Sequence, residues 1–206
     1  MPHLNSIFIQ PFFLFKSPVS SLVFVISSLL CINAEAYEFN GVASIGWDLW
    51  GGDVVATGTG VDCANPDVRA NSGVVISAGG VLINGAFETQ ATVGYKYASP
   101  SGEDGSIVWD SIPLELLQFY RTGNLRMGLG IAYHANSKLI ADVPGSPFSK
   151  YYNNALGGIV QLGWAPATKT YSIDLRYTAI EYQQKDAVNI ANTNGNVLGI
   201  YTSYYF

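Results

Sequence analysis

The chain has 206 residues, 49% of them hydrophobic and 12% charged, and a formal net charge of −5 at pH 7. An ordinary soluble domain carries about 25% charged residues, so this composition argues against that class, while the length suits a single domain. Lysine and arginine form no cluster that could neutralise a row of phosphates, which argues against nucleic acid as a partner.

Residues 1–36 predict a signal peptide. Lys16 precedes the apolar stretch SPVSSLVFVISSLLCINAEA, which ends in the small-x-small pattern Ala34-Glu35-Ala36. Cleavage after Ala36 would leave residues 37–206 as the mature domain. The stretch before Lys16 makes the leader long, so either the start codon is assigned too far upstream or the n-region is unusual. Both alternatives are compatible with export.

The two cysteines do not indicate an internal disulfide in the mature domain. Cys31 lies in the leader, and Leu30 in front of it is larger than the residue that a lipoprotein signal prefers. Cys63 then has no partner in the mature domain, so an internal disulfide is excluded. Cys63 is either a reactive thiol or an incidental residue, and the second interpretation is favoured.

After residue 36, hydrophobic residues alternate with polar ones instead of forming the run of about 20 that a membrane helix requires. In FETQATVGYKY, residues 87–97, the odd-numbered side chains form a mostly apolar face and the even-numbered ones a more polar face. The same alternation predicts seven more strands, near residues 42–50, 72–83, 112–121, 125–134, 156–164, 171–178 and 195–206.

The stretch SIPLELLQFYR is the least regular of these strands. Pro113 cannot donate to a sheet, so we expect a bulge near it. Leu117 and Phe119 fall on the more polar face, where we expect them to fill the space left by Gly128 and Gly130.

The dipeptide Asn84-Gly85 predicts a two-residue hairpin turn, because both residues tolerate a positive φ. Pairing outward from this turn places Leu82 opposite Phe87.

The connections between the predicted strands alternate between long and short. The odd ones, such as residues 51–70 and 135–154, are long, and the even ones are tight turns. A barrel that crosses an outer membrane shows this arrangement, because its odd connections face outside and its even connections face the periplasm. We therefore predict an all-β fold over residues 37–206, an eight-stranded antiparallel up-and-down transmembrane β-barrel.

The last predicted strand carries Leu198, Ile200, Thr202, Tyr204 and Phe206 at alternate positions, and all of them except Thr202 are apolar or aromatic. This pattern resembles the C-terminal signal of bacterial outer-membrane barrels, and residues 37–206 resemble the small eight-stranded barrels of the OmpA/OmpX-like family. The resemblance implies insertion in the outer membrane of a Gram-negative bacterium and recognition of Leu198, Ile200, Tyr204 and Phe206 by the barrel-assembly machinery. Thr202 departs from the pattern, and no peptidoglycan-binding domain follows the barrel.

Aromatic residues recur near the ends of the predicted strands. Those near the short turns are Phe87, Tyr120, Trp164, Tyr171, Tyr204 and Phe206, and those near the long connections are Trp47, Tyr97, Tyr133 and Tyr177. We expect them to form aromatic belts at the two membrane interfaces.

Charged residues on the inward face are the main candidates for a site. The acidic ones are Asp48, Glu88, Glu115 and Asp174, the basic ones are Lys96, Arg121, Arg126 and Arg176, and His134 lies among them. An eight-stranded barrel is just wide enough for its own side chains, so we expect these groups to fill the lumen with ion pairs. A narrow conducting path is the alternative, and a wide porin is excluded by the strand number.

The sequence YHANSK contains the only candidate catalytic pair, His134 and Ser137. A serine activated by histidine could attack an ester of lipid A, and the lipid A deacylase family carries a similar His-x-Ser-Asn. Here the hydroxyl is moved by one position, which should turn it to the other face of the strand. We therefore expect a protein without enzymatic activity, and no pattern predicts a metal site or a cofactor.

The favoured function is a contribution to envelope integrity or surface contact through residues 51–70 and 135–154. The alternatives are a narrow channel or transporter for small solutes, hydrophobic ones included, and a lipid A acyl-modifying enzyme. Outer-membrane lipid and lipopolysaccharide are the expected partners, and we expect a monomer.

Overall fold

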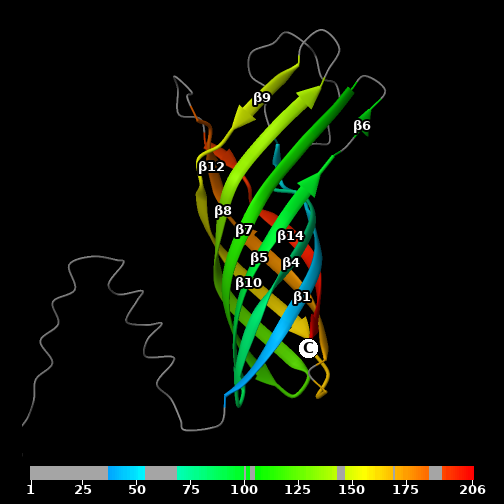
Figure 1. Ribbon diagram of the computed structural model, residues 1–206, viewed down its shortest axis with the longest axis vertical. Helices are drawn as coiled ribbons and strands as arrows, with labels where there is room; N and C mark the ends of the chain where they lie inside the picture. Colours follow the sequence, from blue (N-terminus) through cyan, green and yellow to red (C-terminus); the bar gives the residue numbers. More distant parts are fainter. Residues whose placement is uncertain are drawn as a thin grey trace, which may run out of the picture. The chain divides into compact units, whose positions relative to one another are not determined.

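Figure 1 shows the computed structural model, which describes residues 37–53, 69–99, 101–102, 105–142, 147–168, 170–185 and 192–206. The expected signal peptide and Cys63 lie outside these ranges. Residues 37–206 belong to one compact unit. Within the described ranges, no helix is long and apolar enough to span a bilayer.

Eight strands form a closed ring. They are β1 (Glu38–Leu49), β4 (Gly73–Asn84), β5 (Phe87–Ala98), β7 (Gly105–Thr122), β8 (Leu125–Asp142), β10 (Ala155–Trp164), β11 (Tyr171–Ala179) and β14 (Val197–Tyr205). Each strand pairs antiparallel with its neighbours in this order, and β14 pairs with β1. This confirms the predicted eight-stranded up-and-down β-barrel of the transmembrane type (Figure 1).

Six short strands lie in the longer connections. They are β2 (Gly52–Asp53), β3 (Arg69–Ala70), β6 (Ser101–Gly102), β9 (Phe148–Tyr151), β12 (Glu181–Gln183) and β13 (Asn192–Asn194). Strands β7 and β8 each have 18 residues and extend beyond the other strands of the ring (Figure 1). Much of the expected loop 135–154 is therefore strand, because β8 continues to Asp142 and β9 pairs back onto it.

The barrel closes where the last strand meets the first. Ser44 lies opposite Ser203, and their hydroxyl oxygens are 2.8 Å apart. Beyond the end of β14, the N–H of Gly41 donates to the carbonyl of Phe206 at 2.6 Å, and the N–H of Phe206 donates back at 3.0 Å. The Phe206 ring lies over Gly41, where a Cβ would overlap it. The seam is thus hydrogen bonded to the last residue.

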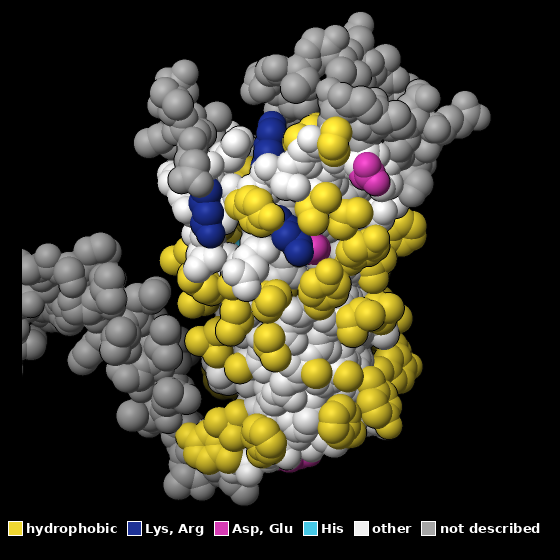
Figure 2. Space-filling view, turned by 45° about the horizontal axis from the view of Figure 1, so that its top comes forward, with side chains coloured by type: hydrophobic (Ala, Val, Ile, Leu, Met, Phe, Trp, Pro, Cys, Tyr) yellow, Lys and Arg dark blue, Asp and Glu magenta, His cyan; other side chains and the backbone are white. Residues whose placement is uncertain are grey.

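Side chains alternate between an apolar exterior and a more polar interior. The exterior positions of every ring strand carry exposed hydrophobic side chains, for example Trp47, Leu129 and Leu162. Figure 2 shows these side chains covering the wall, while most of the charged side chains visible in that view lie near the end with the longer connections. The distribution is the reverse of that in a soluble protein.

The β4–β5 hairpin differs in register from the prediction. Asn84 lies opposite Phe87, so Gly85 and Ala86 form the turn, and Leu82 faces Thr89. Gly85 has a φ of 58°, which suits the first central position of a type II′ turn. The prediction was wrong by two residues, and a shift of two leaves every side chain on its expected face.

The expected bulge lies in the β7–β8 pair, where the register shifts between Asp110 and Ile112, just before Pro113. Opposite it, Asn136 has a left-handed φ of 52°. An extra residue in β8 therefore changes which side chains face inward beyond this point.

The inward face of β7 packs as predicted. Leu117 and Phe119 are buried. A Cβ on Gly128 would overlap the Phe119 ring, and a Cβ on Gly130 would lie 2.9 Å from Cγ of Leu117. Glycine is thus required where these two larger side chains lie over the neighbouring strand β8.

Candidate functional site

Arg126 on β8 is the centre of one buried group of polar side chains. Its guanidinium donates to Glu88 at 3.0 Å, to Gln90 at 2.9 Å and to Asp174 at 3.2 Å. The guanidinium carbon lies 3.4 Å from the centroid of the Phe119 ring. Two carboxylates and an aromatic face therefore surround one fully buried cation, which compensates its loss of hydration.

Neighbouring side chains complete this group. Arg121 lies 2.9 Å from the other oxygen of Glu88. The Ser172 hydroxyl donates to Asp174 at 2.7 Å and lies 3.3 Å from the hydroxyl oxygen of Tyr205. The group spans the lumen, because its members come from β5, β7, β8, β11 and β14.

A second group surrounds Arg176 on β11. Its guanidinium donates to the two oxygens of Glu115 at 2.8 and 2.9 Å, and to Gln161 at 2.8 Å. It also stacks on Tyr201, 3.7 Å from the ring centroid. The Tyr201 hydroxyl in turn donates to Asp48 at 2.8 Å.

Lys96 extends the second group across β5. Its ammonium lies 2.5 Å from Asp48 and donates to the carbonyl and side-chain oxygens of Asn71 at 2.8 and 2.6 Å. A buried lysine is thus held by one charged partner and two neutral acceptors.

All nine inward-facing titratable side chains that we predicted lie in the lumen. Eight of them are joined in ion pairs, four acids with four bases. The neutral members were missed by the sequence analysis, namely Asn71, Gln90, Gln161, Ser172, Tyr201 and Tyr205. The alternation of strand faces could have identified those on the ring strands, since they share the inward phase. Chemically, the arrangement neutralises buried charge and links opposite walls of the barrel.

His134 lies toward the end of the lumen with the longer connections, beside a cluster of aromatic residues. Its Nδ1 is hydrogen bonded to the Tyr182 hydroxyl, with 2.7 Å between the two atoms. The Trp109 ring lies 5.1 Å from the rings of both Tyr152 and Tyr182. Burial raises the pKa of Tyr182, which lies on β12 outside the ring, well above its ordinary value. Tyr182 therefore stays neutral and packs with Trp109 and Tyr152 at this end of the lumen.

The expected orientation of Ser137 was wrong. Both His134 and Ser137 are buried in the interior, because the left-handed Asn136 shifts the alternation by one residue. Ser137 Oγ has no hydrogen-bond partner among the described residues, and His134 Nδ1 is occupied by Tyr182. The two side chains are therefore not joined as nucleophile and base in this structure.

The expected aromatic belts consist of exposed residues. Every aromatic side chain assigned to them is between 40% and 69% exposed. Near the short turns, the Phe87 and Tyr120 rings are 5.5 Å apart and the Trp164 and Tyr171 rings 5.8 Å apart. On β14, Ile200 and Tyr204 point outward, and Phe206 beyond the strand stacks on Tyr204 at 6.3 Å. Leu198, the remaining residue of the expected assembly signal, is partly exposed.

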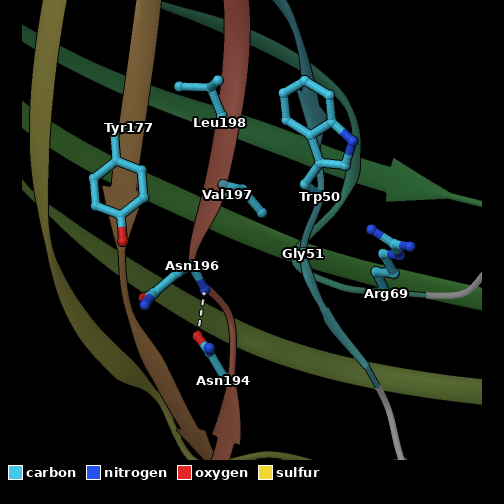
Figure 3. Close-up of a pocket in the computed structure, with 8 residues that line it drawn as sticks. All are labelled: Trp50, Gly51, Arg69, Tyr177, Asn194, Asn196, Val197 and Leu198. Carbon is cyan, nitrogen blue, oxygen red and sulfur yellow. Dashed lines mark hydrogen bonds between the residues drawn. The ribbon is translucent and has the colours of Figure 1, made fainter.

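A hollow of about 600 Å³ opens between the end of β1 and the start of β14. Figure 3 shows its lining, to which Trp50, Arg69, Tyr177, Asn194, Asn196 and Leu198 contribute. Among the described residues, no group of three histidine, cysteine, aspartate or glutamate side chains is placed to hold a metal ion.

Comparison with known proteins identifies the fold but no family. No family model matches the chain, and no curated protein matches its sequence. Among solved structures, the crystal structure of Neisserial surface protein A (NspA) matches 84% of this chain and 100% of its own, with a TM-score of 0.51 and 12% identity. At that identity the likeness shows the fold alone, a small β-barrel of the outer-membrane type.

Proposed function

We propose that the protein is a non-enzymatic integral outer-membrane β-barrel of a Gram-negative bacterium that contributes to envelope integrity or surface interaction. The observation that carries this proposal is the inverted distribution of side chains, with hydrophobic residues exposed on the wall and paired charges buried inside. Such an exterior would aggregate in water, whereas in lipid it is stable because the closed ring leaves no backbone edge unpaired. The strand number and order support a relation to the OmpA/OmpX-like barrels.

The two aromatic belts support an orientation in the membrane. Aromatic rings are stable at the level of lipid headgroups, so the belts mark the two interfaces. The extensions of β7 and β8, the short strands and the longer connections lie together at one end of the barrel. We assign this end to the outer side, because the long connections of outer-membrane barrels face outside. Surface contact would be made there, as is usual for loops on a rigid scaffold.

The filled lumen supports a structural role more than the passage of a solute. Arg126 and Arg176 each bind side chains from several strands, and Trp109, Tyr152 and Tyr182 lie above them. A conducting path would need these groups to separate, which would leave charges buried without partners. The outward alternation on β14 supports recognition by the barrel-assembly machinery.

The test is a heat-modifiability gel on protein refolded into lipid vesicles. A folded barrel resists the detergent and migrates differently before and after boiling, and we expect this shift together with protection of the wall from protease. Unchanged migration would contradict the barrel in lipid. Planar-bilayer recordings of the same sample should show no single-channel steps, and reproducible steps would favour the channel instead.

A further inference from the structure

The hollow in Figure 3 has an apolar and aromatic floor. In the register of the ring, Leu198 on β14 lies between Leu49 on β1 and Tyr177 on β11. Figure 3 shows the Trp50 and Tyr177 rings on either side of β14, with Leu198 between them. The two aromatic side chains are 66% and 45% exposed, so a ligand can reach both.

The rim of the hollow carries two amides whose orientation is fixed. Asn196 Oδ1 accepts from the N–H of Ile180 at 2.9 Å, and Asn194 Oδ1 accepts from the N–H of Asn196 at 2.9 Å, the contact dashed in Figure 3. A backbone N–H can only donate, so each amide turns its oxygen to the backbone and keeps its NH₂ group as a donor. Figure 3 also shows the hydroxyl end of Tyr177 directed toward Asn196, and a phenol can both donate and accept.

The charged residue of the lining does not set the chemistry of the ligand. Arg69 already has an interaction partner, and Asp53 lies opposite it where β2 pairs with β3. No aspartate or glutamate is among the described residues that line the hollow. Recognition would therefore rest on neutral groups, namely two amides, a phenol and an indole, which favours an uncharged ligand.

Trp50 has a backbone conformation that supports a binding role. Its φ of 55° lies in the left-handed region, which is an outlier for a bulky residue. Such conformations persist only where neighbouring structure holds them, and they are frequent at ligand sites. Gly51 supplies that constraint, because a Cβ there would overlap the carbonyl oxygen of Ala70 on β3. The contact with β3 thus holds the end of β1 in the conformation that places the indole at the hollow.

From this arrangement we propose that the hollow binds an uncharged saccharide, with one sugar ring stacked on Trp50 and its hydroxyl groups hydrogen bonded to the amides of Asn194 and Asn196. A sugar ring has C–H groups on its faces and hydroxyl groups around its edge, so it matches an apolar floor with a polar rim. The volume of about 600 Å³ is in the range of small-molecule sites.

Other classes of ligand fit the hollow less well. An apolar solute would cover the floor but leave the two amide donors without acceptors. An anion would need a cation that is not already engaged. The inference rests on the proposed function, because it makes the saccharide a partner in the proposed surface interaction.

The decisive variant is Trp50→Ala. It removes the stacking surface, and because the side chain is exposed, its effect on folding should be small. Trp47→Ala is the matched control, because Trp47 is also on the exterior at 62% exposure but does not line the hollow. Trp50→Phe keeps an aromatic face and should retain most of the binding.

Asn194→Asp provides an independent variant on the rim. Its carboxylate keeps an oxygen for the N–H of Asn196 and replaces the NH₂ donor with an acceptor. Asn153→Asp is its control, because Asn153 is also exposed but does not line the hollow.

Binding is measured by native mass spectrometry of the detergent-solubilised full chain, titrated separately with two neutral probes. One is the deacylated and dephosphorylated core oligosaccharide of lipopolysaccharide, and the other is the blood-group H trisaccharide from the surface of animal cells. We expect the first to bind more tightly, because the hollow adjoins the lipid-facing row of Trp47 and Ile200. Tighter binding of the second would assign the site to saccharides outside the bacterium's own membrane.

With the tighter probe, Trp50→Ala should weaken binding about tenfold, the order expected for losing an aromatic contact, and Asn194→Asp about fivefold or more. Trp47→Ala and Asn153→Asp should bind as the unchanged protein does. Inorganic pyrophosphate, added in excess, should not displace the saccharide.

Equal binding by Trp50→Ala and Trp47→Ala would overturn the inference, and so would binding of neither probe. Displacement by pyrophosphate would also overturn it, since it would assign the hollow to an anion. Each sample is first checked by the heat-modifiability gel. A protein that shows the gel shift but binds neither saccharide refutes this inference alone, whereas a missing shift in the unchanged protein refutes the proposed function.

Discussion

Arg126 stacks on Phe119, with the guanidinium carbon 3.4 Å from the ring centroid. The edge of the same guanidinium contacts Glu88, Gln90 and Asp174, so both its face and its edge are occupied. A side chain with this many buried partners connects strands that are not neighbours in the sheet. Arg126 therefore links the strands in the half of the lumen that lies nearest the short turns.

Replacing Arg126 should destabilise the barrel strongly. In Arg126→Gln, Asp174 loses its cationic partner and Glu88 keeps only Arg121, so we expect a loss of about 3–5 kcal/mol. The measurement is urea unfolding of the protein refolded in vesicles, followed by tryptophan fluorescence. Lys138→Gln is the control, because Lys138 is 38% exposed and 3.3 Å from Asp110, and its loss should cost about 1 kcal/mol or less. Similar losses for both variants would contradict the central role of Arg126.

Two glycines allow a matched test of packing. A Cβ on Gly46 would overlap the buried Tyr201 ring, whereas a Cβ on Gly158 would meet no atom within 4 Å. Gly46→Ala should therefore cost about 1–3 kcal/mol through displacement of Tyr201 from Asp48 and Arg176. Gly158→Ala should leave the free energy of unfolding unchanged or slightly increased. An unchanged free energy of unfolding in Gly46→Ala would show that Tyr201 can move freely in the lumen.

Thr89 and Gln118 form a hydrogen-bonded pair on the lipid-facing wall, so the effects of replacing them on the free energy of unfolding should not add. Thr89 donates to Gln118 Oε1 at 2.7 Å, and the Gln118 amide donates to two backbone carbonyls at 3.1 and 3.3 Å. Thr89→Val leaves the Gln118 oxygen without a partner in hydrocarbon, and we expect a loss of about 1–3 kcal/mol. The double variant Thr89→Val/Gln118→Leu should recover most of it. A double variant as unstable as the sum of its parts would refute this account.

Phe206 should affect assembly more than stability. Its ring covers Gly41 but is 69% exposed, so Phe206→Ala removes little buried area and should cost about 1 kcal/mol or less. If the alternating pattern of β14 is read during assembly, the heat-modifiable fraction in the cell envelope should fall several-fold. Tyr171→Ala, at an exposed belt position near the same end, is the control and should assemble normally. A large loss of unfolding free energy with normal assembly would give Phe206 a purely structural role.

The sequence was sufficient to predict which side chains face inward and which face outward on most strands, because alternation is a local property of each strand. It could not fix the β4–β5 register, since turns at Asn84-Gly85 and at Gly85-Ala86 leave the same residues facing the lumen. It also failed beyond His134, where the single left-handed residue Asn136 changes the phase of β8. Such a change depends on how β7 and β8 pair, which the alternation within one strand does not encode.

For the site, the charged residues could be found but not their partners. Arg126 and Asp174 lie on β8 and β11, which are separated by β10, so their contact crosses the lumen. The hollow was missed for a similar reason. Arg69, Trp50 and Asn194 come from three distant segments, and each is unremarkable in its own stretch of sequence.

The seam between β1 and β14 also constrains how the molecule folds. Ser44 and Ser203, which meet there, are separated by 159 positions in the chain. Contacts of this sequence separation slow folding, because the chain must lose much of its freedom before they can form. In any state in which β14 has not yet paired, strand β1 therefore has an unpaired edge, and the closed ring requires this long-range pairing.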